Sequence, residues 1–119
     1  MKTVLWISRH EMTDTQWQDL KRIMGGPVRL IPWKDTVQEV SELSGAVAKA
    51  DVIAAVLPLT MMGDLLRLAD GKPVIQAVSE RVPAGTLRRL PDGRAEPQFE
   101  FVHRHWQQVL RLECRTRIL

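Results

Sequence analysis

Short apolar runs recur along the chain and are separated by polar segments. Residues 3–7, 52–57 and 73–78 are nearly continuous apolar runs, which are typical of strands buried on both faces of a sheet. Residues 28–33 alternate in part, and Pro32 favours a position near a sheet edge, because proline has no N–H to donate to a neighbouring strand. The pattern therefore predicts four strands in the first two thirds of the chain.

Helical patterns fill the gaps between these strands. Thr13 and Gln16 have the spacing of a capping box, and Met12 and Trp17 have that of a hydrophobic staple, so a helix is expected to begin at Thr13. Gly25 should end it. A second helix is expected to be capped by Asp35 or Thr36 and to end near Lys49, with Val37, Val40, Leu43 and Val47 on its buried face. A third is expected over residues 60–69 and is closed by Asp70-Gly71.

Strictly alternating strands and helices are typical of a parallel sheet with right-handed crossovers. The sequence therefore predicts an α/β, Rossmann-like domain with a four-stranded parallel sheet and three helices. No internal repeat or linker is visible, so we expect a single domain over residues 1–119, with a parallel βα core at 1–80 and a β extension at 81–119.

The extension has a different pattern from the core. Residues 90–94 (LPDGR) predict a turn, and residues 98–106 look like a strand. Residues 109–118 alternate, so a second strand is expected there. These strands predict an antiparallel β addition to the sheet edge, or a dimer arm. The residues expected to face inward are Leu110, Leu112, Cys114 and Ile118.

Composition narrows the class of protein. The content is 45% hydrophobic and 26% charged, as in a globular protein, and the longest apolar run, 52–59, is too short to cross a bilayer. Arg9 and His10 interrupt the apolar start before it reaches the length of a signal peptide. Cys114 is the only cysteine, so no internal disulfide can form. We expect a cytoplasmic protein without membrane contact.

Charge is unevenly distributed. Residues 1–80 carry nine Lys/Arg against ten Asp/Glu, whereas residues 81–119 carry eight Arg, no Lys and four acids. The guanidinium group suits phosphate, so an anionic partner is one interpretation of this basic extension. A solvated edge whose charges prevent aggregation is the other, and both remain open.

Candidate chemistry follows the strands. Ligands of open α/β sheets bind at the carboxyl ends of the strands, and helix N-termini there favour anions. Hydroxyl, imidazole and cationic groups collect at these positions and predict an anion or phosphate site, although the hydroxyls are equally suited to capping and turns. The candidates are Ser8, Arg9, His10, Trp33, Lys34, Leu59, Thr60, Ser79 and Arg81.

Other chemistries lack support. Neither a G-x-G-x-x-G fingerprint nor a P-loop is present, which disfavours dinucleotide and nucleotide-triphosphate enzymes. His103 and His105 should share one face of a strand, but no third ligand lies in an obvious register, so neither a metal nor a cofactor is expected. Trp33 and Trp106 are the tryptophans placed to stack on a base.

Both ends of the chain resemble a known group. The first strand, followed by Ser8-Arg9-His10-Glu11-Met12-Thr13-Asp14-Thr15-Gln16, resembles the Ser-His-x-Leu-Thr-x-x-Gln start of small stand-alone CRISPR-associated ring nucleases with CARF-like Rossmann folds. The segment 79–81, the Asp92-Gly93 turn and residues 101–106 (FVHRHW) are similar to that group's C-terminal strand. Arg9 stands between the serine and the histidine, and residues 57–60 replace a Gly-Asp pair.

The resemblance implies a homodimer that binds cyclic oligoadenylate, a second messenger of type III CRISPR defence, across the subunit interface. It also implies metal-free cleavage by the ribose 2′-hydroxyl, with Ser8 and His10 as catalytic residues and Arg81 as a phosphate anchor. Such a ring carries its own nucleophile, so the protein needs only to align it and stabilise charge, with His10 as acid or base. Duplex DNA is not an expected partner.

Two alternatives belong to other functional classes. One is a non-catalytic cyclic-nucleotide sensor or sponge, in a host or in a phage or other mobile element. The other is a ligand-free dimerisation module. Turnover without metal separates the enzyme from the sponge, and a nucleotide-dependent rise in melting temperature separates both from the module.

Overall fold

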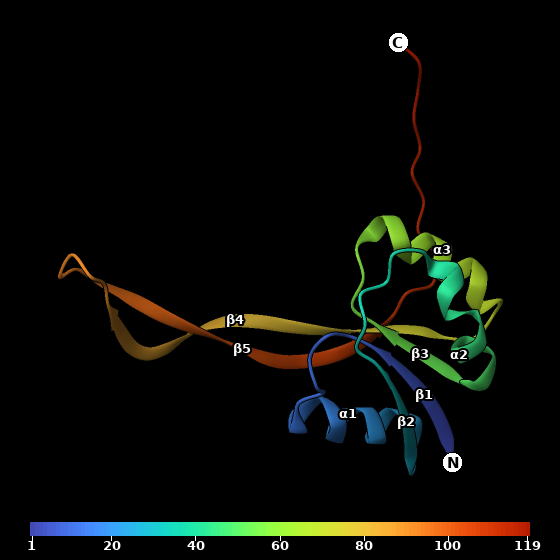
Figure 1. Cartoon of the computed structure of the whole chain (residues 1–119), viewed down its shortest axis with the longest axis horizontal. Helices are drawn as coiled ribbons and strands as arrows, with labels where there is room; N and C mark the ends of the chain where they lie inside the picture. Colours follow the sequence, from blue (N-terminus) through green and yellow to red (C-terminus); the bar gives the residue numbers. More distant parts are fainter.

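One five-stranded sheet organises the chain, with helices on both of its faces (Figure 1). The computed structural model describes residues 1–119 and has a mixed α/β architecture. The strand order is β2-β1-β3-β4-β5, in which β1–β2, β1–β3 and β3–β4 pair in parallel and β5 is antiparallel to β4. The strands are β1 (Lys2–Ile7), β2 (Val28–Trp33), β3 (Val52–Ala55), β4 (Val74–Arg89) and β5 (Ala95–Gln108). The helices are α1 (Asp14–Met24), the 3₁₀ turn η1 (Val40–Leu43), α2 (Ser44–Lys49) and α3 (Leu59–Ala69).

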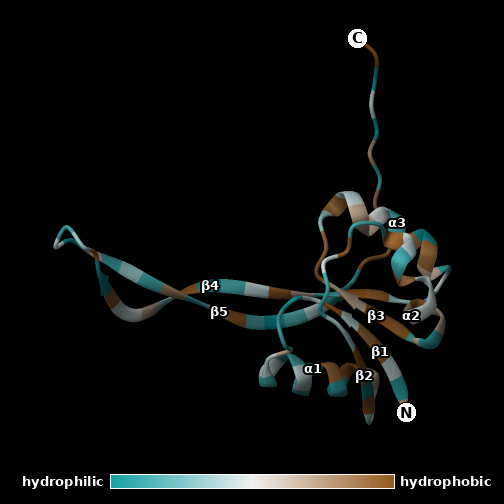
Figure 2. Ribbon diagram, viewed as in Figure 1, coloured by the Kyte–Doolittle hydropathy of each residue, from teal (hydrophilic) through white to brown (hydrophobic).

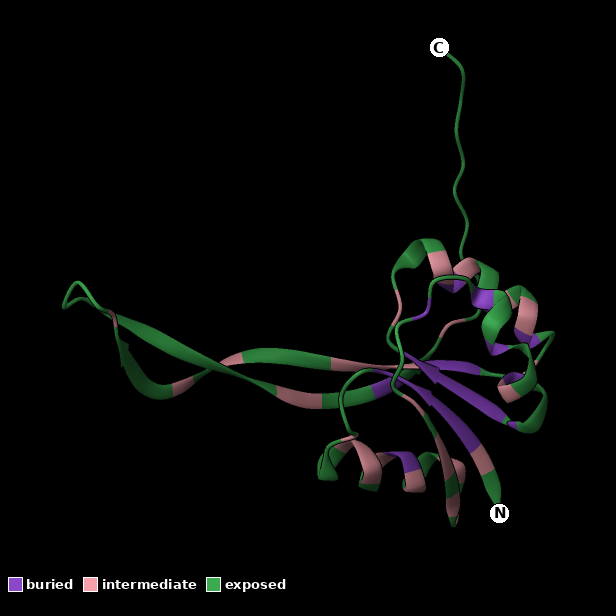
Figure 3. Ribbon diagram, viewed as in Figure 1, coloured by how far each residue is buried: buried purple, intermediate pink, exposed green.

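The core lies on both faces of the sheet because alternate strand residues point in opposite directions. Leu5 and Ile7 of β1 pack on the side of η1, α2 and α3, whereas Val4 and Trp6 pack on the side of α1. The buried residues lie mainly along β1, β3 and the start of β4, between these helices (Figure 3). Ile53 and Ala54 of β3 divide in the same way. The expected pattern of strands buried on both faces is confirmed for β1 and β3.

Helix α1 begins where the sequence predicts. The Thr13 hydroxyl accepts a hydrogen bond from the Gln16 N–H at 3.2 Å, and the Gln16 side chain accepts one from the Thr13 N–H at 2.9 Å. Gly25 ends the helix at φ 75°, a left-handed conformation that favours glycine. Met12 and Trp17 pack against the cluster that lies under this helix.

The second predicted helix begins later than expected. Residues 35–39 form an irregular connection, and helical structure starts at Val40. Neither Asp35 nor Thr36 caps it, because Glu39 is the residue that precedes the first helical turn. The Thr36 hydroxyl accepts a hydrogen bond from Arg9. The four residues predicted to be buried here, Val37, Val40, Leu43 and Val47, are all buried.

The fourth strand is much longer than predicted. It does not end at Val78 but continues to Arg89 and pairs with β5 along this length, with register shifts after Val78 and Pro83. We call residues 79–104, which project beyond the rest of the sheet, the arm (Figure 1). The predicted turn at 90–94 is confirmed and forms the tip of the arm, with Gly93 at φ 86°. The predicted antiparallel addition is therefore present, but it extends beyond the sheet and does not only cover its edge.

Residues 110–119, which we call the tail, contain no regular structure, so the strand predicted over 109–118 is wrong. Leu110, Leu112, Cys114 and Ile118 are exposed and do not face a core. The side-chain bonds of the tail join Glu113 to two neighbouring arginines within the tail itself. Alternation marks two faces of an extended segment, but a strand also needs a neighbour to bond with.

No helix in the molecule has the length and apolar content needed to span a membrane.

Candidate functional site

A hollow opens where the carboxyl ends of β1, β2 and β3 meet. In the sheet, β2 lies on one side of β1 and β3 lies on the other. The order of the strands therefore reverses at β1, which is where open α/β sheets bind ligands. The volume of the hollow is about 220 Å³. Its polar lining residues are Ser8, Arg9, Asp35 and Thr36, and its apolar ones are Ile7, Val37, Val56, Leu57, Pro58 and Met61.

Ser8 is the buried polar residue that lines this hollow, 7% exposed. Its N–H donates to the Trp33 carbonyl at 3.1 Å and so continues the pairing of β1 with β2. Its Oγ accepts a hydrogen bond from the His10 N–H at 3.1 Å. Ser8 therefore shapes the loop after β1, and its hydroxyl proton remains able to turn towards a ligand.

His10 is held by its backbone. Besides the bond to Ser8, its carbonyl accepts a hydrogen bond from the indole N–H of Trp6 at 3.0 Å. The imidazole is exposed and stands beside the hollow without lining it. Fixing both backbone groups lowers the conformational freedom of the loop and leaves the imidazole open to solvent.

Arg9 is the one cationic side chain that lines the hollow. Its guanidinium donates to the Thr36 Oγ1 at 2.8 Å and so connects the loops that follow β1 and β2. Three residues after β3 form the apolar wall, and Val56 among them is 59% exposed. A guanidinium beside an exposed apolar wall can contact both a phosphate and a planar base.

The second strand end contributes less to the hollow than expected. Trp33 packs against the core with its indole N–H buried and unpartnered. Lys34 bonds to Glu11 at 3.3 Å and lines a different hollow, of about 320 Å³, on the α1 side of the sheet. Leu59 and Thr60 are exposed at the start of α3 and do not line the hollow at the strand ends.

The fourth strand end is not at this edge at all. Because β4 continues through Val78, Ser79 and Arg81 lie within the paired strands of the arm. The Arg81 guanidinium lies 3.8 Å from the centre of the Phe99 ring. The structure therefore brings Ser8 and Arg9 together, places His10 beside them, and separates Ser79 and Arg81 from them.

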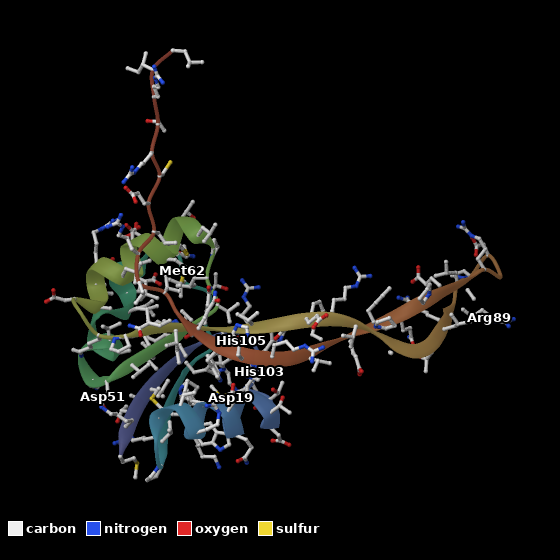
Figure 4. The ribbon with its side chains drawn as sticks, turned by 180° about the vertical axis from the view of Figure 1, so that it is seen from behind. Asp19, Asp51, Met62, Arg89, His103 and His105 are labelled. Atoms are coloured by element: carbon white, nitrogen blue, oxygen red, sulfur yellow. The ribbon has the colours of Figure 1, made fainter.

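The two histidines of β5 are not equivalent, although the sequence predicts that they share one face of a strand. A register shift between Val78 and Ser79 leaves Arg104 as an extra residue between them. The His103 side chain is 5% exposed, and its Nε2 lies 2.8 Å from Asp19 of α1, while His105 is exposed (Figure 4). The hydrogen bond from His103, with a smaller effect of Arg22, lowers the pKa of Asp19 below its usual value. Trp106 is also structural: it is buried, and its indole donates to the Gln16 carbonyl.

Sequence reasoning missed the contribution of the loop after β2. Asp35, Thr36 and Val37 line the hollow although they were assigned to a helix. No local pattern distinguishes a helix cap from a loop that reaches across strand ends.

The structure brings no group of three or more His, Cys, Asp or Glu close enough to hold a metal ion. No family model, curated protein or solved structure matches this chain.

Proposed function

We propose that the hollow at the strand ends binds a cyclic oligoadenylate, that a homodimer forms the complete site, and that the protein is a metal-independent ring nuclease. The observation that carries the proposal is that Arg9 lines a hollow at this edge together with the buried Ser8 and with the exposed apolar residue Val56. The alternation of parallel strands with helices supports a Rossmann-like, CARF-like assignment, and a cytoplasmic location fits a nucleotide messenger.

The size of the hollow supports a site shared between two copies. Typical pockets for small ligands have volumes of about 300–1,000 Å³. At about 220 Å³, this hollow suits a single nucleotide moiety and is too small for a ring of several nucleotides. A two-fold dimer with facing strand ends offers two such hollows to one symmetric ring.

The chemistry requires few groups from the protein. The 2′-hydroxyl of one ribose attacks the adjacent phosphorus, the bond to the 5′-oxygen breaks, and a 2′,3′-cyclic phosphate and a 5′-hydroxyl form. In this scheme His10 accepts the 2′-hydroxyl proton and its conjugate acid protonates the leaving 5′-oxygen. Arg9 and the Ser8 hydroxyl stabilise charge on the non-bridging oxygens.

A second candidate, a binder without turnover, is favoured by one observation. The ionisable residues that line the hollow are Arg9 and Asp35, and His10 stands outside it. The nuclease scheme assigns proton transfer to His10, and this imidazole does not line the hollow. In a sensor or sponge, Arg9 would bind the phosphate and no proton transfer would be needed.

Thermal-shift titration with cyclic tri-, tetra- and hexa-adenylate, followed by product analysis, tests the proposal. Ligand at 100 times Kd should stabilise the protein by about 2.7 kcal/mol. Arg9→Ala removes a charge-assisted bond of about 1.5–3 kcal/mol, equivalent to a roughly 10- to 100-fold rise in Kd. The matched control is Arg29→Ala, an exposed arginine near the opposite end of β2, which should bind like the wild type.

Variants of the histidine then separate the two candidates. His10→Ala should keep the Kd and slow cleavage by about 100-fold or more. Stabilisation of the wild type without any product would support the sponge in place of the nuclease. The absence of stabilisation by every ring would refute nucleotide binding altogether.

A further inference from the structure

Apart from its base, where α1 covers the side chain of His103, the arm leaves the sheet without a covering layer on either face. It extends past the ends of the other strands, and its residues are exposed or half-buried (Figures 1 and 3). Two-stranded ribbons of this kind are marginally stable in water unless a third strand or another layer packs against them. The radius of gyration of the chain is 17.6 Å, against about 13.5 Å for a compact domain of this length.

One face of the arm is aromatic. Residues directly opposite each other on paired strands share a face, and Arg81 is opposite Phe101 while Pro83 is opposite Phe99. We call these four residues the aromatic face. Phe101 is 76% exposed and Phe99 is 44% exposed. Clustered phenylalanine and arginine are enriched at protein interfaces, and an exposed apolar cluster indicates a surface that becomes covered.

The charges of the arm point to the kind of partner. Hydrophilic residues make up much of the arm (Figure 2). Its five arginines and four acidic residues are interspersed along the sequence of the arm. Arg104 bonds to Glu80 and Arg94 bonds to Asp92, both at 2.6 Å, and Arg88 is opposite Glu96. A nucleic acid would need a net cationic stripe, which these pairs remove. Interspersed charges of nearly equal number can complement a second copy of themselves.

We propose that the arm is the dimerisation element, in which the aromatic faces of two copies pack against each other about a two-fold axis. Two ribbons then form one four-stranded unit, which gives each ribbon the layer that it lacks. Such an interface is isologous, since the same residues contribute from both copies. This inference deepens the proposed function. The identity of the ligand rests on the proposed function, but the dimer does not. The inference assigns the contact between the two copies to residues outside the hollow.

Light scattering coupled to size exclusion, at low micromolar concentration without ligand, tests the inference. The wild type should have twice the 13.6 kDa mass of the chain, and Phe101→Asp should halve it. Leu110→Asp is the matched control, because Leu110 is equally exposed, at 81%, but lies in the tail. This control should remain dimeric. A monomeric wild type, or a Phe101→Asp variant that stays dimeric, would overturn the inference.

A cysteine variant tests the same interface in case Phe101→Asp does not fold. Phe101→Cys in a Cys114→Ser background should form an intermolecular disulfide on oxidation, because residue 101 of each copy lies near the axis. Leu110→Cys in the same background should not. A dimer in which neither cysteine cross-links would refute packing through the aromatic face, and a wild type that becomes monomeric after nuclease treatment would assign the arm to nucleic acid.

The two proposals can fail separately. If the wild type is a dimer, Phe101→Asp is a monomer and no ring binds, the arm is confirmed as the dimerisation element and the proposed function is wrong. If a ring binds with Arg9-dependent affinity but Phe101→Asp remains dimeric, the proposed function holds and the arm has been wrongly assigned.

Discussion

Asp19→Ala sets two physical effects of opposite sign against each other. Asp19 is the sixth residue of α1, where alanine is the better helix former by about 0.5 kcal/mol, so helix propensity alone predicts a more stable protein. The same change removes the carboxylate that bonds to His103. The imidazole is 5% exposed and its Nδ1 is already unpartnered, so the variant leaves both ring nitrogens without a protein partner.

The loss of the carboxylate should outweigh the gain in propensity. A buried polar group left unpartnered costs about 1–3 kcal/mol. Subtracting the propensity gain leaves a net destabilisation of about 0.5–2.5 kcal/mol. For a chain of this size that corresponds to a fall in Tm of roughly 2–10 °C. Urea denaturation monitored by tryptophan fluorescence gives the free energy of unfolding directly.

The chain provides a close control in α3. Asp64 is also the sixth residue of an 11-residue helix and also pairs with an arginine three residues later, Arg67, but its side chain is 54% exposed and contacts no histidine. Asp64→Ala loses an exposed ion pair of about 0.3–0.5 kcal/mol and gains about as much in propensity, so its stability should not change. If the two variants agree within about 0.5 kcal/mol, the contact with His103 does not stabilise the fold and the reasoning is wrong.

The stabilisation that Asp19 provides depends on pH in a defined way. The pKa of Asp19 is lowered in the folded protein, mainly by the hydrogen bond with His103, so the folded state binds a proton at this site less readily than the unfolded chain. The stabilisation is therefore fully present above the ordinary pKa of 3.8 and is lost as the pH falls through the lower folded value. The contribution of Asp19 to the difference in stability between the wild type and Asp19→Ala should shrink in acid.

Two further changes test local features. Thr13→Ala removes the capping bond to Gln16 and should cost about 1 kcal/mol in thermal denaturation, whereas Thr60→Ala, at an exposed residue of α3 with no side-chain hydrogen bond, should cost little. Deleting residues 110–119 should leave the free energy of unfolding within about 0.5 kcal/mol of the wild type, since the side-chain bonds of the tail are internal to it. A larger loss on deletion would show that the tail packs in solution.

Local patterns predicted the elements whose signals lie within a few residues of each other. The capping box of Thr13 and Gln16 needs only three residues, and the buried run of β1 is defined by its own side chains. Burial was also predictable where the helix boundary was not. Val37 and Val40 face the core although the helix starts later, because the apolar spacing reports which side faces inward and not the backbone conformation.

Pairing between distant segments was not predictable in the same way. Residues 81–89 contain a proline, a glycine and three arginines, which looks like a loop, yet the segment becomes strand because residues 95–101 pair with most of it. Residues 110–118 have the better alternation but no neighbour, and they remain irregular. The candidate site follows the same rule. Ser8 and Arg9 were found from the end of β1, whereas Ser79 and Arg81 were misplaced with the end of β4.

The attachment of α1 to β5 has a consequence for how the chain folds. Asp19 and Gln16 meet His103 and Trp106 across 84 and 90 positions in sequence. On a ribosome that adds about 5–20 residues per second, α1 waits several seconds before these two residues are even synthesised. During that interval the apolar side of α1 and the indole of Trp6, which packs edge-on against Trp106 at 5.9 Å, lack part of their cover. Completion of this side of the core therefore has to wait for β5, and the nascent chain leaves this apolar surface partly uncovered until β5 emerges.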